Sequence, residues 1–125
     1  MKKFSTKWKG SSKPRRQRKH RMNAPLHIKK KFVHAHLSKD LKKKYGKRST
    51  GLRKGDKVKV IIGEFRKHEG KIERIDLKKT QVFVSGIETT KKDGTKKLLP
   101  VHPSNLIITE MGMEDKIRQE ILSKK

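Results

Sequence analysis

Arginine and lysine residues at close spacing near the N-terminus are the groups in this sequence that are best suited to chemistry. Residues 1–50 hold 19 Lys and Arg against one acid, Asp40, whereas residues 51–125 hold 18 Lys and Arg against 11 acids. A guanidinium carries a planar fork of donors that matches phosphate oxygens, and it can also stack on an unpaired base. The pattern predicts phosphate binding by Lys13, Arg15, Arg16, Arg18, Lys19, Arg21, Lys29, Lys30, Lys31, Lys43, Lys44, Lys47 and Arg48.

The partner predicted by this charge is RNA. The formal net charge is +25 over 125 residues, and each cation that neutralises a phosphate releases condensed counterions, so that affinity falls as salt rises. The sequence holds neither a dimer zipper nor a Cys/His finger, which favours irregular RNA over DNA. A solvated charge run and an import signal are the alternatives. Membrane binding is disfavoured because no bulky apolar face opposes the lysines.

Histidines offer a second kind of chemistry, metal binding, but their surroundings argue against it. His34 and His36 are two residues apart and could face the same way on a strand, whereas the nearby lysines 29–31 disfavour a divalent cation. We therefore expect no metal and no other cofactor, and we expect the histidines to stack on RNA or to hydrogen-bond with it.

Catalysis is not expected either. The acids that follow Gly51 alternate with basic residues, as where Glu73 adjoins Arg74, and this is typical of exposed ion pairs. The sequence lacks a Ser/His/Asp order, a glycine-rich phosphate loop before a helix, and paired carboxylates in an apolar setting. We predict that the protein is not an enzyme and has no small-molecule substrate.

The composition limits how much of the chain can pack into a core. Hydrophobic residues make up 30% of the chain and the mean hydropathy is −1.00, well below an average globular domain. The longest apolar runs are three residues, as at 60–62, so no membrane span and no signal peptide are expected. The absence of cysteine excludes disulfides and thiolate chemistry. We expect a cytosolic chain with one small domain that is not an obligate homo-oligomer.

Charge divides the chain into three parts. Residues 1–50 are predicted to form a basic N-terminal extension, within which residues 1–22 should be disordered without RNA because like charges at this density repel. Residues 51–110 should form the folded domain. Residues 111–125 should form a C-terminal helix or tail, in which apolar residues recur at helical spacing at Ile117, Ile121 and Leu122.

One short helix is predicted inside the basic extension. It should cover residues 38–45, because Ser38 is a suitable N-cap and Gly46 is placed to end the helix. Pro25 is a residue that can open a short helix further upstream.

Short runs of alternating apolar residues predict strands in the middle of the chain, at residues 57–62, 71–77, 81–85, 98–101 and 105–109. Ile72 and Ile75 are three residues apart, which requires a bulge in the second strand. Asp93 and Gly94 predict a hairpin with a type I′ turn. Short strands at this spacing favour a mostly β protein with a small closed barrel of about five strands.

The residues at the start of this domain resemble a known motif. Lys54–Val60, Gly63 and then Glu69–Ile72 resemble the KOW motif of ribosomal proteins and transcription elongation factors, with Gly55, Gly63 and Gly70 as its glycines. Flanking segments extend the resemblance over about residues 11–110, to the archaeal and eukaryotic form of the universal large-subunit ribosomal protein family twenty-four, called twenty-six in eukaryotes. These segments are Ser12–Lys19, Ala24–His27, Leu37–Leu41, Lys44–Ser49 and His102–Asn105.

The resemblance implies an SH3-like barrel that binds large-subunit rRNA near its 5′ end, enters the subunit early in assembly and lies near the exit of the polypeptide tunnel. The implied partners are that rRNA and neighbouring large-subunit ribosomal proteins. The flanking segments add His27, His102 and Ser104 as candidate RNA contacts. The alternative is a KOW module of a transcription elongation or termination factor that binds RNA polymerase or nascent RNA.

One position departs from the family. Its members often carry a glycine where this chain has Lys67. A positive φ would strain a lysine there, so either the loop is remodelled or the angle is ordinary. The resemblance implies that Arg66, Lys67 and His68 in this loop contact RNA.

Overall fold

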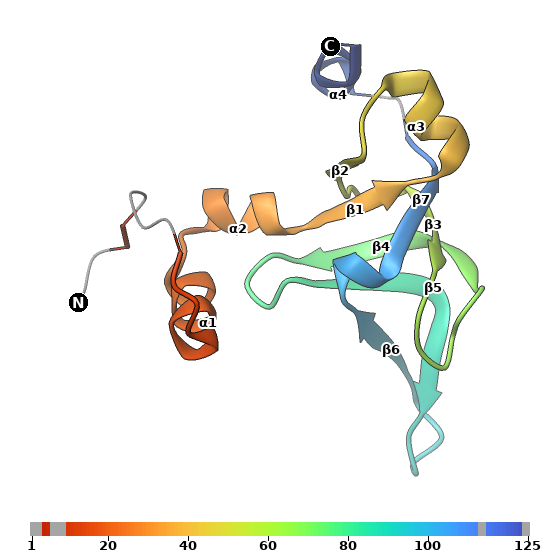
Figure 1. Cartoon of the computed structure of the whole chain (residues 1–125). Helices are drawn as coiled ribbons and strands as arrows, with labels where there is room; N and C mark the ends of the chain where they lie inside the picture. Colours follow the sequence, from red (N-terminus) through yellow and green to blue (C-terminus); the bar gives the residue numbers. More distant parts are fainter. Residues whose placement is uncertain (1–3, 6–9, 113–114, 124–125) are drawn as a thin grey trace.

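The protein is built around one seven-stranded sheet with the strand order β2-β1-β7-β3-β4-β5-β6. The computed structural model describes residues 4–5, 10–112 and 115–123. Figure 1 shows α1 and α2 reaching away from the sheet toward the N-terminus, and α4 beside α3 and β2. The strands are β1 (His34–Leu37), β2 (Ser49–Gly51), β3 (Lys57–Val60), β4 (Glu69–Asp76), β5 (Gln81–Thr90), β6 (Lys96–Val101) and β7 (Leu106–Glu110). The helices are α1 (Pro14–Asn23), α2 (Leu26–Phe32), α3 (Lys39–Tyr45), the 3₁₀ turn η1 (Pro103–Asn105) and α4 (Lys116–Ser123).

Alternating apolar side chains from the strands meet in one core. Val58 and Val60 of β3 are buried, as are Val82 and Val84 of β5, while the residues between them are more exposed. This is the period of two that a strand with one buried face requires. The largest fully buried side chains include Leu37, Ile72, Ile87, Leu106 and Ile108. The fold is mostly β, as predicted, and is consistent with a small SH3-like barrel.

Two strands lie upstream of the predicted five. β1 pairs with β2 in antiparallel fashion and with β7 in parallel, and its residues Ala35 and Leu37 are each only 1% exposed. The core therefore begins at Val33, before the boundary that the charge asymmetry places near Gly51. His34 and His36 alternate with Ala35 and Leu37, and this alternation is typical of a strand. It places Ala35 and Leu37 on the opposite, buried face.

The predicted strands are present, with shifted ends. β3 stops at Val60, and Ile62, which was expected inside it, is 64% exposed. β4 shifts register against β5 between Ile72 and Arg74, which confirms the predicted bulge. β5 runs on to Thr90, five residues beyond its predicted end.

The hairpin between β5 and β6 is confirmed, but its predicted turn type is wrong. A type I′ turn needs positive φ at both central residues, whereas Gly94 has φ +80 and Asp93 is not in the positive region. Hydrogen bonds run from Lys91 N–H to the Thr95 carbonyl and from Gly94 N–H to the Lys91 carbonyl. The loop thus has three residues, closed by a glycine in the left-handed region.

The helix predicted at residues 38–45 is present as α3, and a second helix follows Pro25. Ser38 Oγ accepts a hydrogen bond from Leu41 N–H and Gly46 ends α3 at φ +64, while α2 starts directly after Pro25. The chain also forms α1, with Pro14 at its first position, inside the segment expected to be disordered without RNA. None of the described helices is long and apolar enough to span a membrane.

The C-terminal helix α4 is present, but it buries only one of the three predicted apolar residues. Ile117 and Ile121 are 63% and 54% exposed, whereas Arg118 and Leu122 are 3% and 2% exposed. The predicted helix and the burial of Leu122 are confirmed, whereas the predicted roles of Ile117 and Ile121 are wrong, because the other buried residue of α4 is Arg118.

Arg118 can be buried because its guanidinium pairs with the carboxylate of Asp56, which lies in the KOW-like segment. Their side chains form two parallel hydrogen bonds, with Nη1 2.6 Å from Oδ1 and Nη2 2.7 Å from Oδ2, and Asp56 is fully buried. The carboxylate also accepts the backbone N–H groups of Arg53 and Gly112, and Arg118 Nη2 donates to the Gly51 carbonyl. This bidentate pair joins the turn before β3, the end of β7 and α4.

Gly70 is required for close packing between β4 and β5. A Cβ at this position would lie 2.5 Å from the Ser85 carbonyl oxygen and 2.8 Å from Val84 Cγ1, and neither group can move without disturbing β5. The other two motif glycines serve backbone conformation instead, since Gly55 and Gly63 have φ of +91 and +106 with open space around them.

Replacing Arg118 tests the buried ion pair. Arg118→Gln should lower the free energy of unfolding by about 3–5 kcal/mol, because it leaves a buried carboxylate without its counter-charge. Arg53→Gln, which removes a partly exposed pair with Asp115, should cost about 1 kcal/mol or less. Urea denaturation followed by circular dichroism measures both, and equal losses would contradict a special role for Arg118.

Replacing Gly70 tests the close approach of β4 to β5. Gly70→Ala should lower the free energy of unfolding by about 1–3 kcal/mol through overpacking. Gly112→Ala is the matched control, because the nearest atom to its new Cβ would be 3.9 Å away. Thermal unfolding of the two variants should separate them, and an unchanged midpoint for Gly70→Ala would refute the steric account.

Candidate nucleic-acid interface

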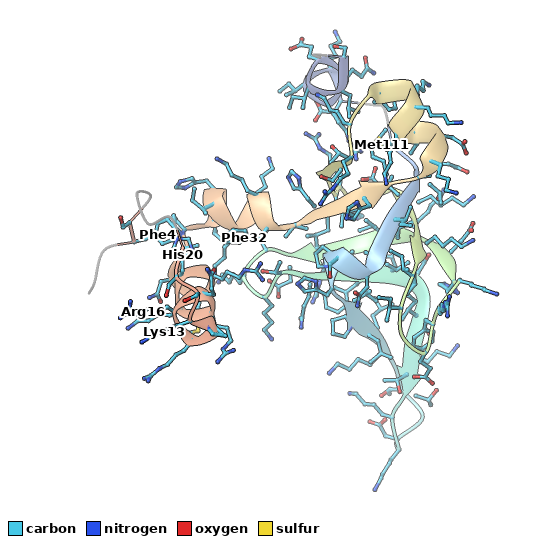
Figure 2. All side chains as sticks on the ribbon, in the orientation of Figure 1. Phe4, Lys13, Arg16, His20, Phe32 and Met111 are labelled. Carbon is cyan, nitrogen blue, oxygen red and sulfur yellow. The ribbon has the colours of Figure 1, made fainter. Side chains whose placement is uncertain are left out.

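The densest group of cations lies on α1. The helix contains five Lys and Arg residues in ten and buries none of its residues. Lys13, Arg15, Arg16 and Lys19 line a hollow of about 340 Å³, and Figure 2 shows Lys13 and Arg16 on the side of α1 that faces away from the sheet. A hollow lined by four cations is suited to a phosphate group.

Ring contacts among the described residues join α1 to its neighbours. The Arg21 guanidinium lies 5.6 Å from the centre of the Phe32 ring, and Phe4 and His20 stack with ring centres 4.6 Å apart (Figure 2). A ten-residue helix is marginal in water, and like charges four residues apart, as at Arg15 and Lys19, oppose it. The disorder of residues 1–22 without RNA stays a prediction; residues 1–3 and 6–9 lie outside the described residues.

α2 carries the second basic run. His27, Lys30 and Lys31 are exposed. Lys29 Nζ donates a hydrogen bond of 3.3 Å to the Lys78 carbonyl in the turn between β4 and β5. This hydrogen bond joins α2 to the β4–β5 turn of the sheet.

The cations at the end of α3 differ in their surroundings. Lys43, Lys44 and Arg48 are exposed, and the Lys44 ammonium lies 5.4 Å from the Tyr45 ring. Lys47 donates to the Ile121 carbonyl in α4. Lys47 therefore has a partner within the protein, while the other three present their charges to solvent.

The loop between β3 and β4 places its three candidate residues differently. Arg66 and Lys67 are exposed, whereas the His68 ring turns inward and Nε2 donates to the Ser85 carbonyl at 2.9 Å. Lys67 has φ +73, and its N–H donates to the Val60 carbonyl. Neither a remodelled loop nor an ordinary φ is found at Lys67. The lysine adopts the left-handed angle that a glycine would adopt without strain.

His102 and Ser104 form one local unit before β7. His102 Nδ1 lies 2.7 Å from Ser104 Oγ and accepts a hydrogen bond from Ser104 N–H, which caps η1. Both side chains are exposed. The predicted RNA contacts are thus distributed over α1, α2, α3, one loop and η1 rather than gathered in one cleft.

Ion pairs on β3 shift the titration of two surface groups. Lys59 Nζ lies 2.9 Å from Glu69 Oε1, and this hydrogen bond holds the pKa of Glu69 below its usual value. Lys57 Nζ lies 3.0 Å from Glu110 Oε1, and that hydrogen bond raises the pKa of Lys57. Both lysines are therefore already paired with carboxylates.

The histidine pair on β1 does not form part of a metal site in the described chain, where no group of three His, Cys, Asp or Glu residues is placed to hold an ion. Burial lowers the pKa of His34, which favours its neutral form.

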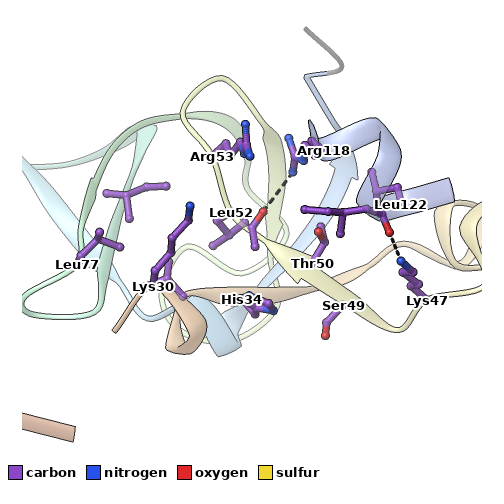
Figure 3. Close-up of a pocket in the computed structure, with 14 residues that line it drawn as sticks. Lys30, His34, Lys47, Ser49, Thr50, Leu52, Arg53, Leu77, Arg118 and Leu122 are labelled. Atoms are coloured by element: carbon purple, nitrogen blue, oxygen red, sulfur yellow. Dashed lines mark hydrogen bonds between the residues drawn. The ribbon is translucent and has the colours of Figure 1, made fainter. Parts of the chain in front are cut away.

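An apolar hollow of about 530 Å³ lies where α4 meets β2 and the β4–β5 turn (Figure 3). Leu52, Leu77 and Leu122 contribute apolar walls, with Lys30 and Arg53 among the lining cations. Figure 3 marks the hydrogen bonds from Arg118 to the Gly51 carbonyl and from Lys47 to the Ile121 carbonyl. These contacts show that the hollow is shaped by the docking of α4.

The fold and its surface define a small, mostly β protein that carries an exposed cationic extension. A family model that describes the eukaryotic ribosomal proteins L26 and their archaeal counterparts matches residues 11–125, and the chain belongs to this family. It is a ribosomal protein with a structural role and is not an enzyme.

Two curated relatives are each named large ribosomal subunit protein uL24. The protein of Methanosphaera stadtmanae is 45% identical over 115 residues, which cover 92% of this chain and 98% of the relative. The protein of Methanothrix thermoacetophila is 45% identical over 114 residues, which cover 91% of this chain and 98% of the relative.

Replacing Lys67 tests the strained loop. A non-glycine residue in the left-handed region costs about 1–2 kcal/mol, so Lys67→Gly should raise the free energy of unfolding, by about 0–1 kcal/mol once the flexibility of glycine in the unfolded chain is subtracted. The control is Arg66→Gly, because the neighbouring Arg66 has an ordinary φ. This change should lower the free energy of unfolding. Chemical denaturation compares the two, and a loss of stability in both would show that Lys67 is not strained.

Proposed function

We propose that this protein is a structural constituent of the large ribosomal subunit and that it acts there by binding rRNA. The observation that carries the proposal is α1, a helix whose every described residue is unburied and half of whose residues are Lys or Arg. Such a helix has no role in the protein core, and its charge needs a polyanion to offset it. The names of the two archaeal relatives support the large subunit as its place, and hence a location on cytoplasmic ribosomes.

The mechanism is a division of labour between the sheet and the extension. The sheet, to which the Asp56–Arg118 pair joins α4, gives a rigid body that fixes position and orientation. α1 and α2 extend from it and neutralise phosphates that would otherwise repel one another as the RNA compacts. Because α1 is marginal alone, its ordering and its binding should be coupled.

The resemblance to the family supports a more definite place for this activity. The rRNA segment is near the 5′ end of the large-subunit RNA, the protein enters early in assembly, and it lies near the exit of the polypeptide tunnel beside other large-subunit proteins. Exposed Arg66 and Lys67 in the β3–β4 loop, with His102 and Ser104 at η1, are candidate contacts on the sheet itself.

Neutralising α1 tests the proposal. Arg15→Gln, Arg16→Gln, Arg18→Gln and Lys19→Gln together should weaken binding to a 5′ fragment of large-subunit rRNA, and the slope of log affinity against log salt should become shallower by roughly 0.7–0.9 for each phosphate that is no longer neutralised. The matched control removes four other exposed lysines, Lys39, Lys54, Lys91 and Lys92, and should change the slope less. Fluorescence anisotropy from low to near-physiological salt gives both slopes.

A scrambled RNA of equal length completes the test. The ribosomal proposal requires that the 5′ fragment keeps an advantage over the scrambled RNA as salt rises. If both affinities collapse together, or if the α1 variant binds the 5′ fragment as well as the wild type does, the proposal that the protein binds this rRNA specifically through α1 fails.

A further inference from the structure

A row of three side chains crosses the outer face of the sheet on β4, β5 and β6, which lie side by side in Figure 1. Arg74 is opposite Phe83, and Phe83 is opposite Pro100. Val82 and Val84 on either side of Phe83 are fully buried, so Phe83 belongs to the face of the sheet that looks away from the core. The row therefore presents a guanidinium, an aromatic ring and a proline ring in one line.

The Arg74 guanidinium covers the Phe83 ring. Its Cζ lies 4.5 Å from the ring centre, and the Arg74 side chain is exposed. The sequence predicts a different contact, an ion pair with the neighbouring Glu73, whereas the structure places the guanidinium over the Phe83 ring. A planar cation held by an aromatic ring is a surface on which a further flat group can stack.

The row lies in a groove of about 670 Å³ with a positive lining. Lys79, Lys96 and Lys97 join Arg74 around it, against a single carboxylate, Asp76. Asp76 Oδ1 is already used, since it accepts the backbone N–H groups of Lys78 and Lys79 in the β4–β5 turn. Lys96 pairs only loosely with Glu88, at 3.8 Å and with its own side chain 75% exposed. The groove thus has free positive charge beside a stacking surface.

We propose that this groove holds an unpaired RNA nucleotide, with its base stacked on the Arg74–Phe83 pair and its phosphates near Lys79, Lys96 and Lys97. The inference rests on the proposed RNA-binding function and adds a second kind of contact to it. Unpaired bases in RNA stack on aromatic rings and guanidinium planes, and stacking together with a cationic groove is how proteins hold single strands. Gln81, which also lines the groove, has amide groups that can hydrogen-bond to a base edge.

The groove and α1 should differ in the way their loss affects binding. α1 acts on phosphates, so its neutralisation changes the salt slope. Phe83→Leu keeps an apolar side chain and every charge, so it should weaken binding to the 5′ rRNA fragment by roughly 5- to 100-fold and leave the salt slope unchanged. Arg74→Lys keeps the charge but removes the plane, and should also weaken binding without changing the slope. Phe83→Tyr retains the ring and should bind as the wild type does.

The experiment uses the full chain with two probes, the 5′ rRNA fragment and a short single-stranded oligonucleotide containing 2-aminopurine. Stacking should quench the 2-aminopurine fluorescence in the wild type and in Phe83→Tyr, and the quenching should be lost in Phe83→Leu. Circular dichroism verifies the fold. Should Phe83→Leu fail to fold, Arg74→Lys at an exposed position carries the same test.

The outcomes separate the two proposals. If Phe83→Leu and Arg74→Lys bind both probes with wild-type affinity while the α1 variant does not, the stacking proposal is overturned and rRNA binding stands. If the 5′ fragment has no advantage over scrambled RNA but the oligonucleotide still depends on Phe83, the groove stands as a single-strand site and the proposal of specific binding to the 5′ rRNA segment falls. If crosslinking from a photoreactive residue at position 83 in assembled subunits reaches only protein, the groove is a protein-docking surface and the stacking proposal is overturned.

Discussion

Asp56 and Arg118 form two parallel hydrogen bonds in a part of the molecule that water does not reach. The carboxylate also orders the turn before β3 through Arg53 N–H and the end of β7 through Gly112 N–H, while the guanidinium fixes α4. Three segments that are far apart in the chain therefore depend on one charge pair. A buried pair of this kind contributes little compared with a well-packed apolar contact, but it is costly to break, so it specifies the arrangement more than it adds to stability.

Charge sets the second constraint. A chain with a net charge of +25 must either disperse its cations or find a polyanion. The protein does both: Lys57 and Lys59 on β3 are paired with Glu110 and Glu69, whereas α1 is left without acids. Pairing is thus concentrated on the sheet and free charge on the extension, which supports the division of labour proposed for rRNA binding.

The sequence correctly predicted structural features that are determined by residues close together in the chain. Ser38 and Gly46 bounded α3 correctly, and the spacing of Ile72 and Ile75 correctly required a bulge. What depends on distant partners was missed. β1 was overlooked because its pairing with β7 is parallel and joins residues about seventy positions apart, and the buried residues of α4 were predicted only in part because only Asp56 makes burial of Arg118 favourable. The RNA-binding residues themselves remain predictions. The sequence identifies the cations, but only the fold shows which of them, like Lys47, already hydrogen-bond within the protein.

The order of the two partners in the chain has a consequence for biosynthesis. Asp56 precedes β3, whereas Arg118 follows the last strand of the sheet. While the chain is being made, all seven strands leave the ribosome before the guanidinium that neutralises the buried carboxylate. The sheet can begin to form during translation, but the turn before β3 keeps an uncompensated charge until α4 has been synthesised. The Asp56–Arg118 pair can therefore form only after all seven strands and the cationic extension have been synthesised.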